Sequence, residues 1–417
     1  MTAKTAVQPV ENFSFFDPEV QSDPYEFYRS LQAKCPVYKG PDKDIYIVSR
    51  YDDLDKALRD YATFSNVMER ALLLQGVNGE VFKQMLREGG WDHVPTLQRS
   101  DPPQHARYRK IIDSAFNVRQ VREMQPRLEA LANELVDKFI DRGETDFIEE
   151  FALPFPGIIA AELIGLDSRD YRTFRAWADN LLSYGTRTLT LDELKQAART
   201  EIEMQHFFAG VFEDRKKNPR EDLMSALVTA YEGVEPLTMH ELQNLMNQLL
   251  TGGNETTTSA ISHALWNLLK FPEQMARLRA DRSLLKNFVE ETLRFETPVL
   301  GLARKTTRDV EVSGTTIPKD ALVVLTYAAA NRDEDKFDDG ESFDVTRRNA
   351  GAQIAFGMGA HFCPGAMLAR QEILSTFEAL LDRLDDIQLA RPLPDETHQR
   401  SVFLHQMKEL PIRFRKR

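Results

Sequence analysis

Apolar residues recur at spacings of three and four from about residue 103 to residue 285. That period is typical of one face of an α-helix. Between about 297 and 330 the spacing changes to alternation and short apolar runs, which are typical of strands and hairpins. Residues 331–355 are polar and irregular, and residues 400–415 alternate again. The pattern predicts a mainly α fold with a minor β region, in a single domain over residues 1–417.

Smaller elements can be read within this outline. Residues 24–35 and 51–60 have the composition of short helices, and they flank the apolar run 45–48, which we expect to be a strand. Residues 310–312 alternate and are followed by a Ser-Gly-Thr turn, and residues 321–325 are apolar. Both segments are typical of strands.

The longest predicted helix covers residues 238–270. Thr238 followed by Glu241 three residues later is a capping-box pattern. A continuous helix over this range would be roughly 50 Å long and would cross a whole domain. Gly252 and Gly253 interrupt it, although each glycine in a helix interior costs about 1 kcal/mol relative to alanine. The two glycines indicate either a kink with close helix packing or a functional opening in the helix.

Charge and cysteine content exclude several classes of protein. The chain has 53 basic and 65 acidic residues, a formal charge of −12, and no basic run before the short segment 413–417, so we expect no nucleic-acid partner. It has only two cysteines, Cys35 and Cys363, which fits a reducing cytoplasm better than a disulfide-stabilised secreted protein. We expect Cys35 to be an inert thiol. No stretch reaches 18 apolar residues, so we expect no membrane anchor.

Cys363 lies in an unusual context. Glycines occur at Gly357, Gly359 and Gly365, and a helix-like run follows over residues 366–372. Glycine lets the backbone approach a flat ligand closely. The N-terminus of a helix stabilises a thiolate and lowers the pKa of the thiol. A buried structural cysteine beside a turn is the alternative, but the flanking residues favour a thiolate ligand.

The segment resembles the cysteine-loop signature of the cytochrome P450 superfamily, F-x-x-G-x-x-x-C-x-G, at all its fixed positions: Phe356, Gly359, Cys363 and Gly365. The resemblance implies haem b bound through the Cys363 thiolate, with Phe356, Gly357 and Gly365 beside the macrocycle. It also implies a single-domain P450 fold, with the haem between the long helix and the helix after the cysteine loop.

Two further runs resemble haem-binding motifs of the family. Residues 101–109 are similar to its D-P-P-x-H-x-x-x-R helix start. The resemblance implies that His105 and Arg109 bind one haem propionate, and that Arg304 and His361 are the other propionate ligands. Arginine suits such a role because its fork donates two hydrogen bonds to a carboxylate.

The glycines of the long helix fall in a run that resembles the family's A/G-G-x-D/E-T motif. By that resemblance Gly252 and Gly253 open space for O₂, and Glu255 and Thr256 form an acid–alcohol pair that delivers protons. Family members that consume peroxide directly often lack this pair. Its presence therefore favours O₂ and two electrons.

Glu291 and Arg294 share one helix face, at the place where the family has a buried scaffold pair. We expect them to be structural. The family often adds an arginine from the following irregular segment. The matching place here is Ser342, so Arg347 and Arg348 are the candidates for that third partner.

The resemblance implies a substrate pocket built from several separate segments. Most of its residues are apolar, so we expect a largely apolar small molecule. The amide of Gln248 could orient a polar group of that molecule. The predicted lining residues are Leu73, Trp91, Val94, Leu97, Gln248, Thr251, Leu300, Leu302, Phe403 and Leu404.

The chain is thus predicted to be a haem-thiolate monooxygenase that inserts one oxygen atom from O₂ into its substrate. No ferredoxin or reductase domain is expected, so the two electrons would come from a separate ferredoxin and its reductase. Arg107, Lys110 and Arg119 are candidates for the docking patch. The alternatives are a peroxide-using or non-oxygenating member of the family, and a non-catalytic haem-binding sensor.

Overall fold

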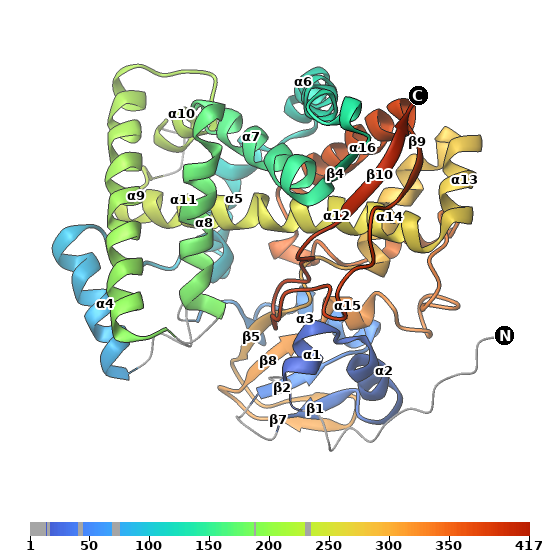
Figure 1. The fold of residues 1–417 in the computed structure, drawn as a ribbon. Helices are drawn as coiled ribbons and strands as arrows, with labels where there is room; N and C mark the ends of the chain where they lie inside the picture. The colour runs from blue at the N-terminus through green and yellow to red at the C-terminus, as the bar shows by residue number, and fades with distance from the viewer. Residues whose placement is uncertain (1–13, 15–16, 41–44, 69–75, 187–188, 230–234) are drawn as a thin grey trace.

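The computed structural model describes residue 14 and residues 17–40, 45–68, 76–186, 189–229 and 235–417. Helices fill most of the molecule, and a β-rich part lies at one end (Figure 1). The fold is therefore mainly α with a minor β region, as the spacing of apolar residues predicts.

The helical part is built around two large apolar cores. One core lies between α6, α12, α14 and α16, and the other between α4, α5, α8, α9 and α11. The helices of this part are α4 (Gly76–Gly89), α5 (Gln104–Ala115), α6 (Val118–Asp137), α7 (Pro154–Leu163), α8 (Tyr171–Thr186), α9 (Leu191–Lys217), α10 (Leu223–Val228), α11 (Met239–Gly253), α12 (Glu255–Lys270), α13 (Pro272–Ala280), α14 (Leu285–Phe295) and α16 (Ala366–Arg383), with short turns at η2 (Leu97–Arg99), η3 (Ile140–Arg142), η4 (Ile148–Ala152), η5 (Ser168–Asp170) and η6 (Arg282–Leu284).

The predicted continuous helix over 238–270 is wrong in one respect, because it is divided into α11 and α12. Asn254 separates them with φ −86° and ψ −66°, and α11 and α12 still run end to end across the molecule (Figure 1). The capping box at Thr238 is confirmed, since its hydroxyl accepts from the Glu241 amide and Glu241 accepts from the Thr238 amide. The division falls directly after the two glycines, where helix propensity is lowest.

The strands form three small sheets, of which the five-stranded one lies in the β-rich part and the three-stranded one lies beside α16 (Figure 1). A five-stranded sheet has the order β1-β2-β8-β5-β3, in which only β2 and β8 pair in parallel. A three-stranded sheet has the order β4-β10-β9, and β6 and β7 form a hairpin. The strands are β1 (Val37–Lys39), β2 (Ile45–Val48), β3 (Phe64–Ser65), β4 (Glu144–Asp146), β5 (Leu302–Thr306), β6 (Val310–Val312), β7 (Thr315–Ile317), β8 (Leu322–Leu325), β9 (Leu384–Leu389) and β10 (Pro411–Lys416).

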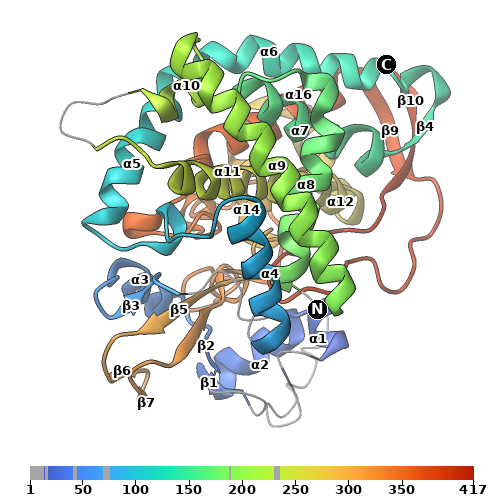
Figure 2. The same cartoon turned by 90° about the vertical axis from the view of Figure 1, so that its left-hand side faces the viewer.

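The sequence pattern explains where these strands lie. All four residues of β2 are buried, as expected for an apolar run that is covered on both faces. The predicted strand over 400–415 is shorter than expected, because β10 covers only its last part. Figure 2 shows the five-stranded sheet at one end of the molecule and α6 and α16 at the other. The remaining helices and turns of this end are α1 (Pro18–Ser22), α2 (Tyr25–Lys34), α3 (Tyr51–Arg59), α15 (Tyr327–Ala330), η7 (Ala350–Ala352) and η8 (Gly359–His361).

Across the part of the chain that the structure describes, no helix is both long and apolar enough to cross a membrane. Cys35 is half-buried, and its thiol donates to the carbonyl of Val37 at 3.2 Å.

Candidate active site

Cys363 sits in a tight loop between η8 and the first turn of α16. Its amide donates to the carbonyl of Phe356 at 3.0 Å, which closes the loop. The amides of Gly365 and Ala366 donate to its sulfur. Burial nevertheless raises the pKa of the thiol, and the two amides and the charge of Arg109 oppose this only in part. The expectation of a lowered pKa is therefore wrong for the protein alone, because desolvation outweighs the helix terminus. A bound metal ion would hold the sulfur as a thiolate.

The glycines of this loop have different roles. Gly357 and Gly359 both have φ +68°, which disfavours any other residue. A side chain at Gly359 would also meet the Leu58 carbonyl of α3 at 2.8 Å, so this glycine allows a close contact with α3 rather than with a cofactor. At Gly365, an added Cβ would lie 3.9 Å from the sulfur of Cys363.

The structure brings His105, Arg109, Arg304 and His361 together beside the cysteine loop. The rings of His105 and His361 lie 4.1 Å apart. Burial and the neighbouring charges of His105, Arg304 and Arg109 lower the pKa of His361 to about 3. The pKa of His105 is lowered by burial and by Arg109. Positive charges on these side chains would repel one another, and an anion bound between them would offset that repulsion.

The hydrogen bonds of this cluster point to the same conclusion. His361 Nε2 is buried without a hydrogen-bond partner, and its distance to Asp101 Oδ1 is 3.8 Å. The Asp101 carboxylate accepts hydrogen bonds instead from the hydroxyl of Ser65, at the end of β3, and from the amide of Asn66, the next residue. A buried polar atom without a partner requires an explanation. The donor set therefore fits the carboxylates of a haem, and Arg304 Nη1, which donates to Ala303 at 2.9 Å, is in place to bind them as well.

The junction of α11 and α12 carries the second predicted group of residues. Gly252 and Gly253 are exposed in the middle of the molecule, and an added Cβ at either would meet no atom within 4 Å. The hydroxyl of Thr256 donates to the Gly252 carbonyl at 2.7 Å. The backbone beside the two glycines is thus open, and Thr256 is held at that opening.

Glu255 is only 4% exposed and points away from solvent. Gln406 Nε2 donates to its Oε2 at 2.5 Å. Burial raises the pKa of the carboxyl, and the charge of Asp179 on α8 raises it further, while Gln406 and Arg175 act in the opposite direction. A carboxyl with a raised pKa keeps its proton at pH values where an ordinary carboxyl has already lost it.

These features are matched by known proteins. The family model of cytochrome P450 matches residues 186–409, which include the α11–α12 junction and the cysteine loop. The chain belongs to the cytochrome P450 family. Putative cytochrome P450 YjiB of Bacillus subtilis (strain 168) is 34% identical to this P450 over 89% of the chain and 90% of that protein. Cytochrome P450 monooxygenase PikC of Streptomyces venezuelae is 33% identical over 99% and 96%.

A solved structure supports the fold as well. CYP109E1 from Bacillus megaterium in complex with testosterone superposes on this P450 with a TM-score of 0.83 and 28% identity, over 95% of this chain and 99% of that one. The relatives and the family model show that the protein is a cytochrome P450 monooxygenase. The family binds haem through a cysteine thiolate, and here Cys363 is at the matching position.

The scaffold pair is fully buried, and its third partner is Arg347. Arg294 donates to both carboxylate oxygens of Glu291, at 2.7 and 2.9 Å. Arg347 donates to Glu291 at 3.1 Å. Ser342, at the matching place in the motif, contributes its carbonyl oxygen to both arginines. Arg348 is exposed.

The predicted pocket residues divide into two groups, and the C-terminal group is brought together. The amide of Leu300 donates to the Phe403 carbonyl at 2.9 Å, and Leu404 forms a β-bridge with Val299, the residue before Leu300. Leu302 begins β5 beside them. Thr251, on α11, donates its hydroxyl to the Asn247 carbonyl of the same helix at 2.8 Å. Their role as a substrate lining stays a prediction.

The other group lies between the segment 91–98 and its neighbouring helices. Trp91 packs its ring 5.3 Å from that of His206 on α9, and Leu97 is buried in η2. The amide of Gln248 is already bonded, since it donates to Thr96 at 2.8 Å and accepts from the Gln98 amide at 3.1 Å. Gln248 therefore holds this segment to α11, and its role towards a substrate stays a prediction. Leu73 lies outside the described residues.

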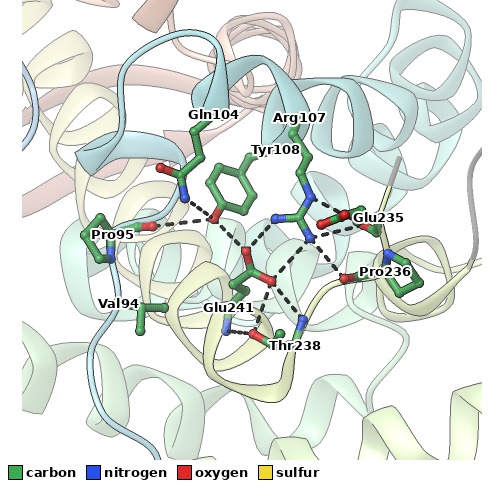
Figure 3. A pocket seen from close by; sticks show the side chains of 9 residues that line it. All are labelled: Val94, Pro95, Gln104, Arg107, Tyr108, Glu235, Pro236, Thr238 and Glu241. Atoms are coloured by element: carbon green, nitrogen blue, oxygen red, sulfur yellow. Dashed lines mark hydrogen bonds and ion pairs between the residues drawn. The ribbon is translucent and has the colours of Figure 1, made fainter. Parts of the chain in front are cut away.

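Val94 lines a cavity of about 340 Å³ between the segment 94–95, α5 and the start of α11 (Figure 3). Figure 3 shows Arg107 at its centre, with the guanidinium bonded to Glu241 and to the carbonyls of Glu235 and Pro236. Arg119 pairs with Glu123 at 2.8 Å. The prediction that Arg107 belongs to a basic docking patch is therefore wrong, because Glu241 on α11 neutralises its charge.

Three functional partners were not expected from the sequence. Arg175 and Asp179 on α8 and Gln406 before β10 surround Glu255. They lie far from Glu255 along the chain and belong to no recurring motif, so no spacing in the sequence indicates them.

Proposed function

We propose that this P450 uses haem b to insert one oxygen atom from O₂ into a C–H or C=C bond of a largely apolar small molecule. When bound, the haem supplies the reductive activation of O₂. The observation that supports this most directly is the position of two sites at the starts of α12 and α16, two helices that pack against each other. The Cys363 sulfur, with two amide donors, precedes α16, and the open backbone with Glu255 and Thr256 interrupts the helix that crosses the molecule.

Each residue of the site has a defined task in this proposal. Cys363 binds the iron, and His105, Arg109, Arg304 and His361 bind the propionates. Their mutual repulsion favours an anion there, as argued above. Thr256 holds a proton at its hydroxyl, and Glu255 replaces that proton.

The class of substrate follows from the apolar residues near β5. Leu300, Leu302, Phe403 and Leu404 form an apolar group, and CYP109E1, which shares the fold, binds testosterone in its solved structure. A screen of apolar compounds for the spin shift of the ferric protein tests this. Only polar or charged compounds causing a shift would contradict it.

We propose a ferredoxin as the electron donor and the cytoplasm as the location, in keeping with two unpaired cysteines. Phe362 and Met367, on either side of Cys363, are 41% and 40% exposed, which is unusual for large apolar side chains. Charge reversal at Lys110 and Arg119, both exposed, should slow reduction by a ferredoxin several-fold. Unchanged reduction rates would contradict this docking surface.

The decisive test of the proposed function is the spectrum of the reduced carbon-monoxide complex, which reports thiolate ligation. Cys363→Ala should abolish the thiolate form, and Cys35→Ala, the matched control, should keep it. A thiolate spectrum in the Cys363→Ala protein would overturn the assignment. Product formation with O₂ and an electron donor distinguishes the monooxygenase from a haem-binding sensor, which would form none.

A further inference from the structure

A second carboxyl group lies against Glu255. Asp179, on the middle turns of α8, shares a side-chain hydrogen bond with the Glu255 carboxyl. α8 crosses α11 beside the α11–α12 junction, which explains how these two distant residues meet (Figure 1). Each of two carboxyls in hydrogen-bond contact disfavours ionisation of the other, so the resting pair shares one proton.

The two members of the pair differ in exposure. Glu255 is 4% exposed, whereas the side chain of Asp179 is 54% exposed. Burial raises the pKa of Asp179, and its hydrogen bond with Glu255 lowers it. A negative charge is better stabilised on the exposed Asp179 beside Arg175 than on the buried Glu255, so Glu255 is the protonated member and Asp179 the ionised one. One end of the pair thus faces water, and the other faces the helix junction.

Neighbouring groups favour this arrangement. Arg175 Nε lies 3.7 Å from Asp179 Oδ2, which stabilises a negative charge on Asp179. Gln406 donates to Glu255 Oε2, and Asn254 Nδ2 lies 3.5 Å from Oε1 in a long hydrogen bond. Arg175 Nε and Asn254 Oδ1 are buried without hydrogen-bond partners. Polar atoms of this kind are the usual binding places of ordered water.

We propose that Asp179 is a positioning residue for proton delivery, which shares a proton with Glu255 and connects that buried carboxyl to solvent. The inference rests on the proposed function, because it concerns the supply of protons to Thr256. In this role Asp179 acts through Glu255.

The proton balance of the cycle is simple. The pair begins with one proton and one negative charge. Glu255 gives its proton towards the hydroxyl of Thr256, after which the pair carries two negative charges beside Arg175. The exposed Asp179 then takes a proton from water and passes it to Glu255, which restores the starting state. No electron is transferred in these steps.

The competing explanation is that the pair only joins α8 to α12. Asp179→Asn separates the two, because asparagine keeps the shape and can still hydrogen-bond Glu255 but cannot carry a proton. The matched control is Asp170→Asn in η5, an exposed aspartate next to the start of α8, which removes the same charge. Asp179→Glu should restore function in part.

The first readout needs no turnover. Infrared spectra of the resting holoenzyme in H₂O and D₂O should contain a C=O stretching band of a protonated carboxyl that Glu255→Gln removes. Asp179→Asn should shift this band, and Asp170→Asn should not. A band that is identical in the Asp179→Asn protein would overturn the inference.

The second readout is the use of O₂ during turnover. Asp179→Asn should lower product formation about tenfold or more, increase the fraction of O₂ released as peroxide, and enlarge the solvent isotope effect. Equal thermal denaturation of the two Asn variants verifies that folding is intact. If Glu255→Gln impairs turnover and Asp179→Asn behaves like the control, the inference fails and the proposed function stands. If the reduced carbon-monoxide complex of the unmodified protein itself showed no thiolate spectrum, the proposed function would be wrong.

Discussion

Replacing Arg294 with lysine should cost this P450 much of its stability. The Arg294 side chain is fully buried and donates to both oxygens of Glu291. It also donates to the carbonyls of Asn331, Gly340 and Ser342, at 2.9, 2.8 and 2.8 Å. The three bonds to carbonyls tie α14 to the irregular segment before the cysteine loop. A lysine has three donors on one nitrogen and cannot reach all of these acceptors.

The magnitude follows from these contacts. Removing one partner of a buried ion pair costs about 3–5 kcal/mol, and Arg294→Lys should cost less through this pair alone because lysine keeps the positive charge. Each carbonyl left without a donor adds about 1–3 kcal/mol if water cannot reach it. Arg347 still neutralises part of the Glu291 charge from 3.1 Å, which offsets some of this loss. The expected cost is therefore about 4 kcal/mol, a large part of the roughly 5–15 kcal/mol that stabilises a typical domain.

The assay is urea unfolding of the purified holoenzyme, followed by circular dichroism and by the haem absorbance in parallel. The matched control is Arg277→Lys, because Arg277 pairs with Asp344 at 3.4 Å and both side chains are exposed. The control should change the unfolding free energy by no more than about 0.5 kcal/mol. If Arg294→Lys and Arg277→Lys had equal unfolding midpoints, the buried network would not stabilise the fold as argued.

Three other outcomes can be checked independently. Burial raises the pKa of Glu372 from 4.5 to about 8. Between these two pH values the unfolded chain releases a proton that the folded protein keeps, so the free energy of unfolding falls as pH rises from about 4.5 to about 8. Glu372→Gln should flatten this decline in thermal denaturation between about pH 5 and pH 8, and an unchanged slope would refute the assignment. Gly359→Ala should lower the free energy of chemical unfolding by about 2 kcal/mol or more, since φ is +68° and the new Cβ would meet the Leu58 carbonyl. Gly351→Ala is the control, because its Cβ would enter open space and should leave the free energy of unfolding nearly unchanged. Pro364→Leu should raise the haem reduction potential in a spectroscopic titration, because it adds an amide donor beside the sulfur, and an unchanged or lower potential would contradict this.

Local patterns in the sequence predicted the site where its residues are close together along the chain. The cysteine loop, the capping box at Thr238 and the Glu291–Arg294 pair each depend on spacings of two to seven residues. Geometry within a loop or one helix turn is fixed by such spacings, so they can be read directly. The same holds for the mainly α architecture, since the period of apolar residues determines which face of each helix is buried.

Tertiary structure decided everything that depends on which segments meet. The pairing of Asp179 with Glu255, the neutralisation of Arg107 by Glu241 and the choice of Arg347 as third partner all join residues from different elements. The sequence by itself determined the helix periods, the caps and the thiol with its two following amides. Only the folded chain determined the pKa of Cys363, because desolvation depends on every element that surrounds the sulfur and outweighs the short-range effect of the helix terminus.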